Sequence, residues 1–461
     1  MADQTKLETR PYLLIVTRNN GGEVLLYLGL PSLPSLDVTL HGRPAEQLVT
    51  GLHQHYSLET CCLWVSHRPT TYGVAPPEKY AVMEILEQNA PPPAGMLWVS
   101  TREAMSRTGG IARAAVEAFI QDLDRYRAGP ETAPFARPAW IQELLSWARA
   151  QLQPFGLRPT GGFWQLNAGP TFSLIRLQTN RAPVWFKATG ETNAHELPIS
   201  VCLERLLPEY VPRILGVHSS WNGWLSAHVR GALLREVEDR LAWEAAAGAL
   251  ARLQIQSIEK STEIRASEVP DLGTGKLAEL IGPFIHRMSE LMQAQEKASP
   301  APLTKVELAS LHDQLGQACR RLEDLGTPES IGRLDLNPGN IIVSRDRVVF
   351  LDWAETYWGH PFFSFAYLLE HFRRQARDLS FEGALQSSYA ETWRAVCAAE
   401  KISEALVIAP LVAAFAYIVA ARSWEQQTLL DPGVAGHLRS MTRRMHREAK
   451  AIEQRRQTCL S

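Results

Sequence analysis

The sequence predicts an α+β protein built as two lobes, with a smaller α/β domain preceding them. Short apolar runs separated by turn residues fill the first half of the chain, which is typical of strands. Beyond Gly231 the apolar residues recur at helical spacing, which predicts a mostly helical second half. A segment with three prolines, 129–138, reads as an extended linker. The predicted boundaries are therefore 1–128 for the first domain, 139–230 for a small lobe and 231–461 for a large helical lobe.

The first domain begins with a predicted hairpin, because apolar runs at 12–16 and 23–28 flank the turn sequence Asn19-Asn20-Gly21-Gly22. A helix over 44–56, strands near 62–65, 79–86 and 96–100, and a helix over 110–126 follow. This order resembles a Nudix hydrolase domain. The metal-binding helix of that family carries R-E-x-x-E-E-x-G, and the aligned positions here are Thr50, Gly51, Gln54, His55 and Ser57. The resemblance therefore implies a degenerate domain without that family's Mg²⁺ chemistry.

The small lobe is predicted to contain a helix over 140–152 and short strands around 163–164, 172–175 and 183–187, followed by a helix over 194–207. The large lobe is predicted to be helical over 241–258, 303–325, 362–378, 383–399, 403–428 and 436–454. Residues 405–421 carry no charge but include Pro410, and they are fewer than the roughly 20 apolar residues that a membrane span needs. We therefore expect a buried core helix there.

Three oxygen-bearing side chains lie in and after one loop of the large lobe. The loop 333–340 contains Asp335 and ends at Asn340, and a predicted hairpin of strands 341–343 and 348–351 leads to Asp352. Phosphoryl transfer needs one group to orient the accepting hydroxyl and oxygen ligands to hold Mg²⁺ against the phosphates. The alternative is a plain hairpin whose Asp and Asn residues only form turns.

At these residues the chain resembles the aminoglycoside phosphotransferase family, whose catalytic loop usually reads H-G-D-x-H-P-G-N and whose metal-binding aspartate lies in I-D-W. The resemblance implies a two-lobed protein-kinase-like fold, ATP as phosphate donor and Mg²⁺ as cofactor. It assigns Asp335 as the catalytic base, and Asn340 and Asp352 as the Mg²⁺ ligands.

The chain departs from the family pattern at three loop positions. Arg333 replaces the leading histidine, Leu334 the glycine, and Asn337 the second histidine. Since the leading histidine usually braces the loop, Arg333 is expected to take over a structural role.

The resemblance also implies nucleotide-binding residues in the small lobe. Lys187, at the end of the strand 183–187, corresponds to the lysine that contacts the nucleotide phosphates, and Glu196 is its expected partner, with Glu191 as the alternative. A solvated lysine and an ordinary acid at a helix N-terminus are the competing interpretations. Gly169, in the turn 167–171, is the candidate for the phosphate-covering loop, although a hairpin turn would explain it equally well.

Composition restricts the partners. A net charge of −2 and the lack of a basic tract predict no nucleic-acid partner, and the expected core helix predicts no membrane association. The six cysteines show no metal-ligand spacing, which predicts reduced thiols, and the N-terminus lacks an apolar signal region, so we expect a cytoplasmic protein. The oligomeric state remains open.

We therefore interpret the chain as an enzyme that transfers the γ-phosphate of ATP to a hydroxyl of a small molecule. Aminoglycoside specificity does not follow, because a polycationic acceptor needs a carboxylate-rich pocket, for which Glu238, Asp239 and Glu370 are candidates. The alternative is a catalytically silent pseudokinase that acts as a nucleotide-binding or interaction module. Arg333, the glycine-poor turn and the degenerate first domain favour it, whereas Asp335, Asn340 and Asp352 oppose it.

Overall fold

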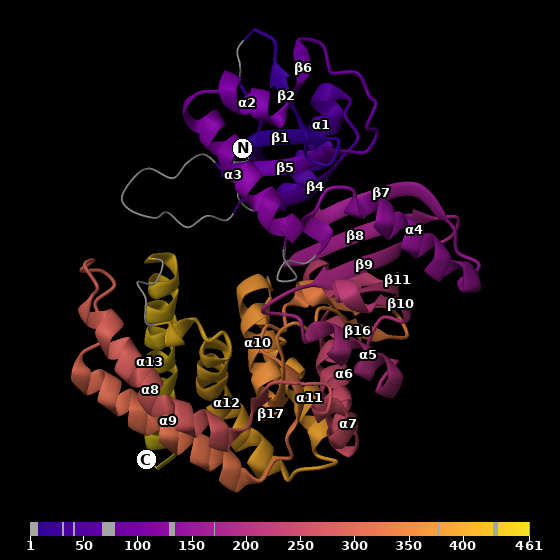
Figure 1. The fold of residues 1–461 in the computed structure, drawn as a ribbon. Helices are drawn as coiled ribbons and strands as arrows, with labels where there is room; N and C mark the ends of the chain where they lie inside the picture. Colours follow the sequence, from indigo (N-terminus) through magenta and orange to yellow (C-terminus); the bar gives the residue numbers. More distant parts are fainter. Residues whose placement is uncertain are drawn as a thin grey trace, which may run out of the picture. The chain divides into compact units, whose positions relative to one another are not determined.

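The computed structural model describes residues 8–29, 32–39, 42–66, 79–128, 134–169, 171–376, 378–426 and 432–460. The chain forms two compact units, shown in Figure 1. The first unit combines Met1–Leu197 with Arg213–His228, and the second combines Pro198–Pro212 with Val229–Ser461. Both units contain helices and strands, so the predicted α+β class is confirmed.

The first unit opens with a mixed sheet of six strands in the order β4-β5-β1-β2-β6, with β3 also paired to β1. Only the β1–β5 pairing is parallel among these strand pairs. The strands are β1 (Thr9–Arg18), β2 (Glu23–Tyr27), β3 (Ser35–Thr39), β4 (Thr60–Val65), β5 (Lys79–Ile85) and β6 (Met96–Ser100). The predicted hairpin is confirmed: Asn19, Asn20 and Gly21 all adopt the positive φ that its tight turn requires.

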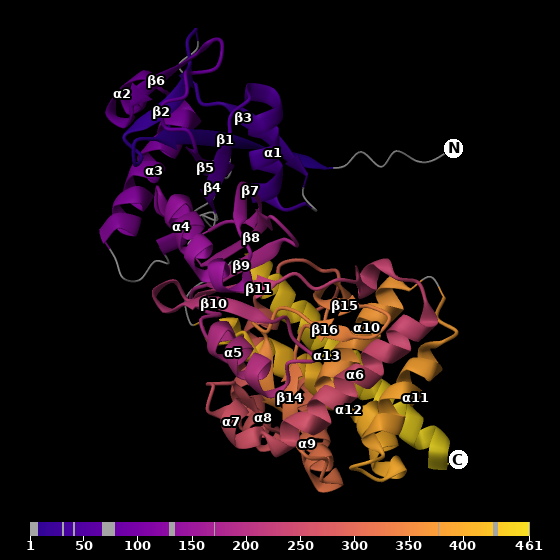
Figure 2. The same ribbon diagram turned by 90° about the vertical axis from the view of Figure 1, so that its right-hand side faces the viewer.

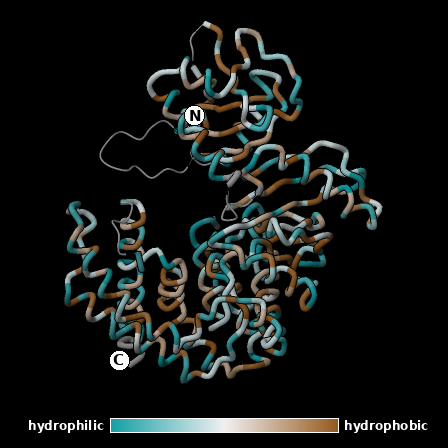
Figure 3. Tube along the Cα trace, viewed as in Figure 1, coloured by the Kyte–Doolittle hydropathy of each residue, from teal (hydrophilic) through white to brown (hydrophobic). Residues whose placement is uncertain are grey.

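Two helices cover the two faces of this sheet. Successive side chains of a strand point to opposite faces, and β1 follows this rule: Ile15 shares a core with Phe119 of α3 (Gly110–Ala128), whereas Leu14 shares one with Leu48 of α1 (Pro44–Tyr56). The strands of the sheet are accordingly rich in hydrophobic residues, drawn brown in Figure 3. A short helix, α2 (Thr101–Arg107), precedes α3.

The first unit also contains an antiparallel sheet of five strands in the order β10-β11-β9-β8-β7. Its strands are β7 (Pro159–Asn167), β8 (Phe172–Thr179), β9 (Val184–Thr189), β10 (Ile214–His218) and β11 (Gly223–Ala227). Helix α4 (Trp140–Leu152) lies against it, as Figure 2 shows. The predicted bounds of this helix are correct.

One hydrophobic core runs through both sheets of the first unit. Buried residues from Leu13 of β1 to Leu225 of β11 belong to the same cluster, with Trp140 of α4 among them. Gln165 of β7 adds a polar link, because its side-chain amide accepts from the N–H of Cys62 and donates to the C=O of Cys62, both at 2.7 Å. The predicted first domain and most of the predicted small lobe therefore lie in one compact unit, whereas Pro198–Pro212 belong to the second unit.

The predicted linker 129–138 is only partly described, since 129–133 lie outside the described residues. Its second half differs from the expected extended chain. Pro134–Ala136 form a 3₁₀ turn, η1, and the Phe135 side chain is buried against Trp140. Burial of this aromatic side chain, which periodicity could not reveal, explains the difference.

The second unit is mostly helical. Its helices are α6 (Arg240–Glu259), α7 (Ser261–Arg265), α8 (Thr274–Gln293), α9 (Lys305–Leu325), α10 (Phe362–Gln375), α11 (Glu382–Trp393), α12 (Ala399–Ala420) and α13 (Pro432–Leu460). Helix α5 (Glu196–Leu206) has its first two residues in the first unit and the rest in the second. Helices α6 and α11 lie side by side (Figure 2), as do α8 and α9 (Figure 1).

Two small sheets accompany these helices. One has the order β12-β15-β16 and the other β13-β17-β14. Their strands are β12 (Ala232–Leu233), β13 (Asp271–Leu272), β14 (Ser330–Arg333), β15 (Ile341–Val343), β16 (Val348–Phe350) and β17 (Thr356–Gly359).

Several helices differ from the prediction: α2 and α7 were not predicted, and α11 ends at Trp393 rather than at 399. The helix expected over 403–428 is α12, which ends at Ala420, because Arg422 adopts a left-handed φ of 51° and a 3₁₀ turn follows. Helix α8 was not predicted, since Pro283 lies in its interior and interrupts the pattern.

Helix α12 confirms the expectation of a buried core helix. By length and composition it could span a membrane, but 67% of its most apolar stretch is buried inside the fold.

Candidate functional site

The hairpin β15–β16 brings Asn340 and Asp352 to the same place. The strands pair antiparallel, with Ile341 opposite Phe350 and Val343 opposite Val348, as predicted. The N–H of Leu351 then donates to the carbonyl of Asn340 at 2.8 Å. Asn340 therefore lies directly beside the backbone that leads into Asp352.

The pairing of β14 with β17 brings Asp335 to this same end of the second unit. Arg333 of β14 lies opposite Thr356 of β17, and the N–H of Leu334 donates to the carbonyl of Glu355 at 3.0 Å. Because the strands are antiparallel, the residue that follows β14 and the residues that precede β17 meet at one edge. Asp335 and the segment 352–355 are those residues.

The loop between Asp335 and Asn340 is held by its own hydrogen bonds. The Oδ1 atom of Asn337 accepts from the N–H of Gly339 at 2.8 Å and so caps the 3₁₀ turn η5 (Pro338–Asn340). The N–H of Asn340 donates to the carbonyl of Asn337, also at 2.8 Å. Asn337, which stands where the family pattern has its second histidine, is thus well suited to cap the turn.

Arg333 joins the two acidic segments of the site. Its side chain is buried, Nη1 donates to the carbonyl of Leu351 at 2.5 Å, and Nη2 donates to the carbonyl of Asp335 at 3.3 Å. Its guanidinium group also lies 5.6 Å from the centre of the Trp353 ring. One planar cation therefore ties the backbone before Asp352 to that of Asp335, the structural role expected for this position.

The carboxylate of Asp335 contacts a histidine that the sequence did not single out. Nε2 of His371, on α10, donates to Oδ1 of Asp335 at 3.1 Å. Their side chains retain 14% and 41% of their exposed surface respectively, so the carboxylate still faces solvent while the imidazole is largely enclosed. No local pattern links the two residues, because 36 positions separate them along the chain.

Negative charge is concentrated at this end of the unit. Glu355 keeps exposed surface, but desolvation of its carboxyl group raises its pKa to about 7. The charges of Asp335 and Asp352 raise this pKa further, and the charge of Arg333 lowers it. Asp352 has a φ of 62°, a left-handed conformation that is uncommon for residues other than glycine and that clusters at functional sites. A bound cation would relieve this crowding of carboxylates.

The oxygen donors suit Mg²⁺. Within the described ranges, no group of three or more His, Cys, Asp or Glu side chains could hold a metal ion. The carboxylate of Asp352 and the amide oxygen of Asn340 are hard ligands, and Mg²⁺ commonly takes one or two such protein groups together with waters and phosphate oxygens. The residues present therefore fit this ion.

In the first unit, the predicted pair of Lys187 and Glu196 is present. Nζ of Lys187, in β9, lies 2.5 Å from Oε1 of Glu196, the first residue of α5. The two side chains are 13% and 1% exposed, so this pair is far less screened than a surface ion pair. Phe172 and Trp224 lie beside the ammonium group, with ring centres at 5.4 and 5.8 Å. These neighbours exclude the interpretation of Lys187 as a freely solvated lysine.

Gly169 follows β7, in the connection to β8. A Cβ atom added there would meet nothing closer than the carbonyl of Phe172 at 3.9 Å. The local backbone therefore does not require glycine, and the phosphate-covering role of Gly169 stays a prediction.

Comparison with known families gives one match. Residues 203–398 match the model of the phosphotransferase enzyme family, and this segment contains Asp335, Asn340 and Asp352. The match does not extend over 1–202, so it leaves the predicted Nudix resemblance of the first domain untested. No curated protein matches the chain.

Several solved structures are similar to this fold at low sequence identity. A choline kinase from Cryptosporidium parvum is 10% identical with a TM-score of 0.48, and 68% of this chain and 97% of that chain are covered. An ethanolamine kinase from Plasmodium vivax is 14% identical with a TM-score of 0.44, covering 65% and 85%. A macrolide 2'-phosphotransferase from Brachybacterium faecium is 15% identical with a TM-score of 0.41, covering 64% and 98%.

Proposed function

We propose that the chain is a phosphotransferase that moves the γ-phosphate of ATP to a hydroxyl of a small molecule. The observation that carries the proposal is the grouping of Asp335, Asn340 and Asp352 at one end of the second unit, held there by two strand pairs and by Arg333. A plain hairpin with turn-forming Asp and Asn residues would not need a buried arginine that joins its two acidic segments. The family match over residues 203–398 supports the same reaction class.

Each residue takes a role suited to its environment. Asp335, exposed to solvent and bonded to His371, orients the acceptor hydroxyl and accepts its proton. Asn340 and Asp352 would hold Mg²⁺, which neutralises charge on the phosphates when it is bound. Lys187, held by the buried carboxylate of Glu196, contacts the nucleotide phosphates.

We do not favour the silent pseudokinase. One of its supports was Arg333, and the contacts of Arg333 with the carbonyls of Leu351 and Asp335 give that residue the bracing function the replaced histidine would have.

The acceptor is not assigned as an aminoglycoside. Glu370 forms ion pairs with Arg374 and Arg444, and Asp239 caps α6 by accepting from the N–H of Leu241. These two acids are therefore engaged, which weakens the case for a carboxylate-rich pocket suited to a polycation.

For the region 1–128 we propose recognition or docking without hydrolysis. The positions where a Nudix helix carries glutamates lie on or just after α1, and none of them is a carboxylate here.

ATP turnover against a panel of amino sugars, amino alcohols and neutral sugars tests the proposed reaction. We expect Mg²⁺-dependent ADP release that one class of hydroxyl compound stimulates. Nucleotide binding without stimulated turnover by any of the panel would instead favour the silent module.

A further inference from the structure

A hollow of about 340 Å³ lies among four helices of the second unit, α10, α11, α12 and α13. Cavities that bind small molecules usually measure about 300–1,000 Å³. In α10 the lining residues Phe362, Ala366 and Leu369 share one face of the helix, and His371, which contacts Asp335, lies on the opposite face. None of the residues that line the hollow belongs to the site around Asp335.

The walls of this hollow are mostly apolar and are not closed by packing. Several apolar lining residues keep accessible surface although helices surround them: Ala366, Leu406, Val407, Pro410, Ala451 and Ile452. Ala366 of α10 and Ala451 of α13 contribute only a methyl group each, so side chains leave room between these helices. Most helix contacts inside a protein are filled as densely as an organic crystal, which makes a hollow of this size an exception.

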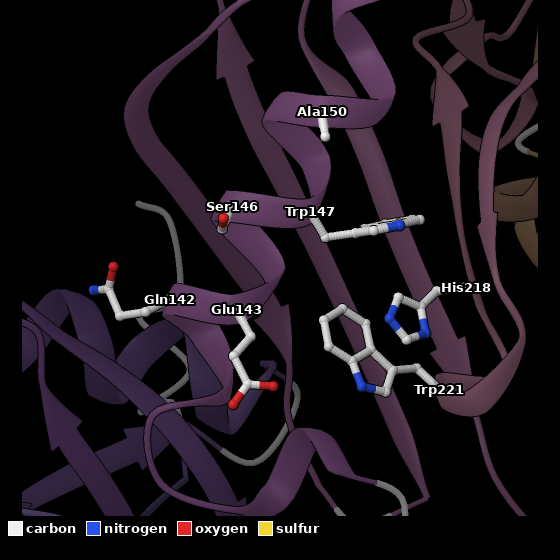
Figure 4. A pocket seen from close by; sticks show the side chains of 7 residues that line it. All are labelled: Gln142, Glu143, Ser146, Trp147, Ala150, His218 and Trp221. Carbon is white, nitrogen blue, oxygen red and sulfur yellow. The ribbon is translucent and has the colours of Figure 1, made fainter.

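A second hollow, beside α4 in the first unit, is of a different kind (Figure 4). Its rings, those of Trp147, His218 and Trp221, pack directly against one another with centres 3.7–5.8 Å apart. Glu143, which also lines it, is already paired with Arg137. That hollow therefore offers no comparable open wall.

One backbone acceptor is left in the wall that α12 contributes. Pro410 lies inside this helix and has no N–H, so the carbonyl of Leu406 lacks the donor that a helix supplies from four residues further on. Leu406 and Pro410 both line the hollow. An enclosed carbonyl without its partner raises the free energy of the fold, and a donor on a bound molecule would remove that cost.

The charged side chains of the lining balance one another. Arg373 donates two hydrogen bonds to the carboxylate of Glu382, at 2.6 and 2.9 Å, and Gln386 donates a third to it at 3.1 Å. Glu448 and Arg455 of α13 add one charge of each sign. The charged groups of the lining therefore sum to zero and select neither an anion nor a cation.

These features decide the class of ligand. Apolar walls favour a hydrophobic body, balanced charges do not attract an ion, and the carbonyl of Leu406 favours one hydrogen-bond donor. We propose that the hollow binds a small uncharged molecule that has a hydrophobic ring system and a single N–H or O–H donor. An engineered cavity of about 150 Å³ in another protein holds benzene, so this larger hollow has room for two fused rings.

Indole is the probe, because it is uncharged, has two fused rings and one N–H, and carries no hydroxyl that could accept phosphate. Benzofuran has the same shape but an oxygen in place of the N–H. The full-length protein is titrated with each compound, and the ligand signals are followed by NMR. We expect saturable binding of indole and about fivefold weaker binding of benzofuran, which cannot donate to the carbonyl of Leu406.

Variants locate the binding. Pro410→Ala restores an N–H that can bond to the carbonyl of Leu406, so indole should then bind no better than benzofuran. Ala451→Leu should weaken the binding of both compounds by at least about tenfold, because the larger side chain occupies the hollow. Ala384→Leu, on α11 but outside the lining, is the matched control and should alter binding by less than about twofold.

Five results would overturn the proposal: no saturable binding of indole, equal binding of benzofuran, an indole preference that survives Pro410→Ala, unchanged binding in Ala451→Leu, or displacement of indole by Mg²⁺-ATP. The last result would place indole in the nucleotide site instead. Thermal unfolding checks that each variant is folded. Ala366→Leu fills the same hollow from α10 and replaces Ala451→Leu if that variant does not fold.

Discussion

At the scale of single residues, the proposed chemistry depends on side chains that differ in what they contact. Asp335 faces solvent and a histidine, whereas Asp352 follows a strand end beside Asn340. Substitution should therefore separate the handling of the acceptor from the handling of the nucleotide.

Asp335→Asn is expected to reduce turnover by about 10²- to 10⁴-fold, the usual contribution of a general base, while leaving nucleotide affinity nearly unchanged. Asp352→Asn should weaken Mg²⁺-ATP binding as well, because it removes a metal ligand. Steady-state kinetics and thermal-shift titration with Mg²⁺-ATP measure both effects. Wild-type turnover in Asp335→Asn would show that the assigned role is wrong.

Arg333→Met should destabilise the fold by about 3 kcal/mol and abolish turnover, because two carbonyls lose a buried charged donor. Arg347→Met is the matched control. Arg347 also binds backbone carbonyls, those of Pro208, Glu209 and Val211, but it does not contact the acidic segments. We expect the control to lose stability in urea unfolding while the folded enzyme keeps its kcat. Equal kcat losses in the two variants would contradict the bracing role of Arg333.

His371 is expected to act as a positioning residue for Asp335. His371→Leu should lower kcat by about tenfold with little change in the KM for ATP, since it removes the hydrogen bond that orients the carboxylate but no proposed nucleotide contact. His371→Gln keeps a side-chain donor and should restore part of the loss. If both variants lowered kcat equally, orientation by this hydrogen bond would not be the cause.

At the scale of elements, the start of α4 is held by an unusual cap. The first residue before the helix, Ala139, has a φ of 68° and no side chain that could cap it. Glu84, buried in β5, supplies the acceptor instead, with both carboxylate oxygens within 2.9 Å of the Ala139 nitrogen. Burial raises the pKa of Glu84 to about 7, and the Ala139 hydrogen bond lowers it only in part.

This cap should make stability depend on pH in a defined direction. Because the folded pKa lies above the unfolded value, the folded state binds more protons, and stability falls as the pH rises from about 4.5 through about 7. Glu84→Gln avoids the buried charge and still offers an acceptor. The difference in free energy of unfolding between Glu84→Gln and the wild type should therefore grow, in favour of the variant, by about 3 kcal/mol from pH 4 to pH 8. Urea unfolding across this range checks the expectation, and a constant difference would contradict it.

At the scale of the whole molecule, one hydrophobic cluster of the first unit extends from the region 1–128 into the small lobe, so this region is not an appendage to that lobe. Removing it would expose apolar side chains around Trp140 and Ile175 and break both hydrogen bonds of Gln165 with Cys62.

A variant lacking residues 1–128 should therefore unfold at a lower urea concentration than the full chain, or aggregate, because it exposes this core. Gln165→Leu in the full chain is the smaller change and should cost about 2 kcal/mol through the two lost backbone partners. Full stability of the shortened chain would show that the small lobe has a sufficient core of its own.

Much of the local structure could be predicted from the sequence. The turn 19–22 and the hairpin that ends at Asp352 follow from residue types at short spacing, whereas the pairing of Lys187 with Glu196 was implied by the family resemblance. The turn and the hairpin depend on turn chemistry and strand alternation, which neighbouring residues determine by themselves.

Only the tertiary structure decided the rest. Gln165 lies 103 residues from Cys62, and His371 lies 36 residues from Asp335, so no periodic pattern connects either pair. The burial of Phe135 and the interior proline of α8 likewise become understandable only once their neighbours are in place. Sequence patterns report which face of an element is apolar, but which distant element covers that face is determined by packing of the whole unit.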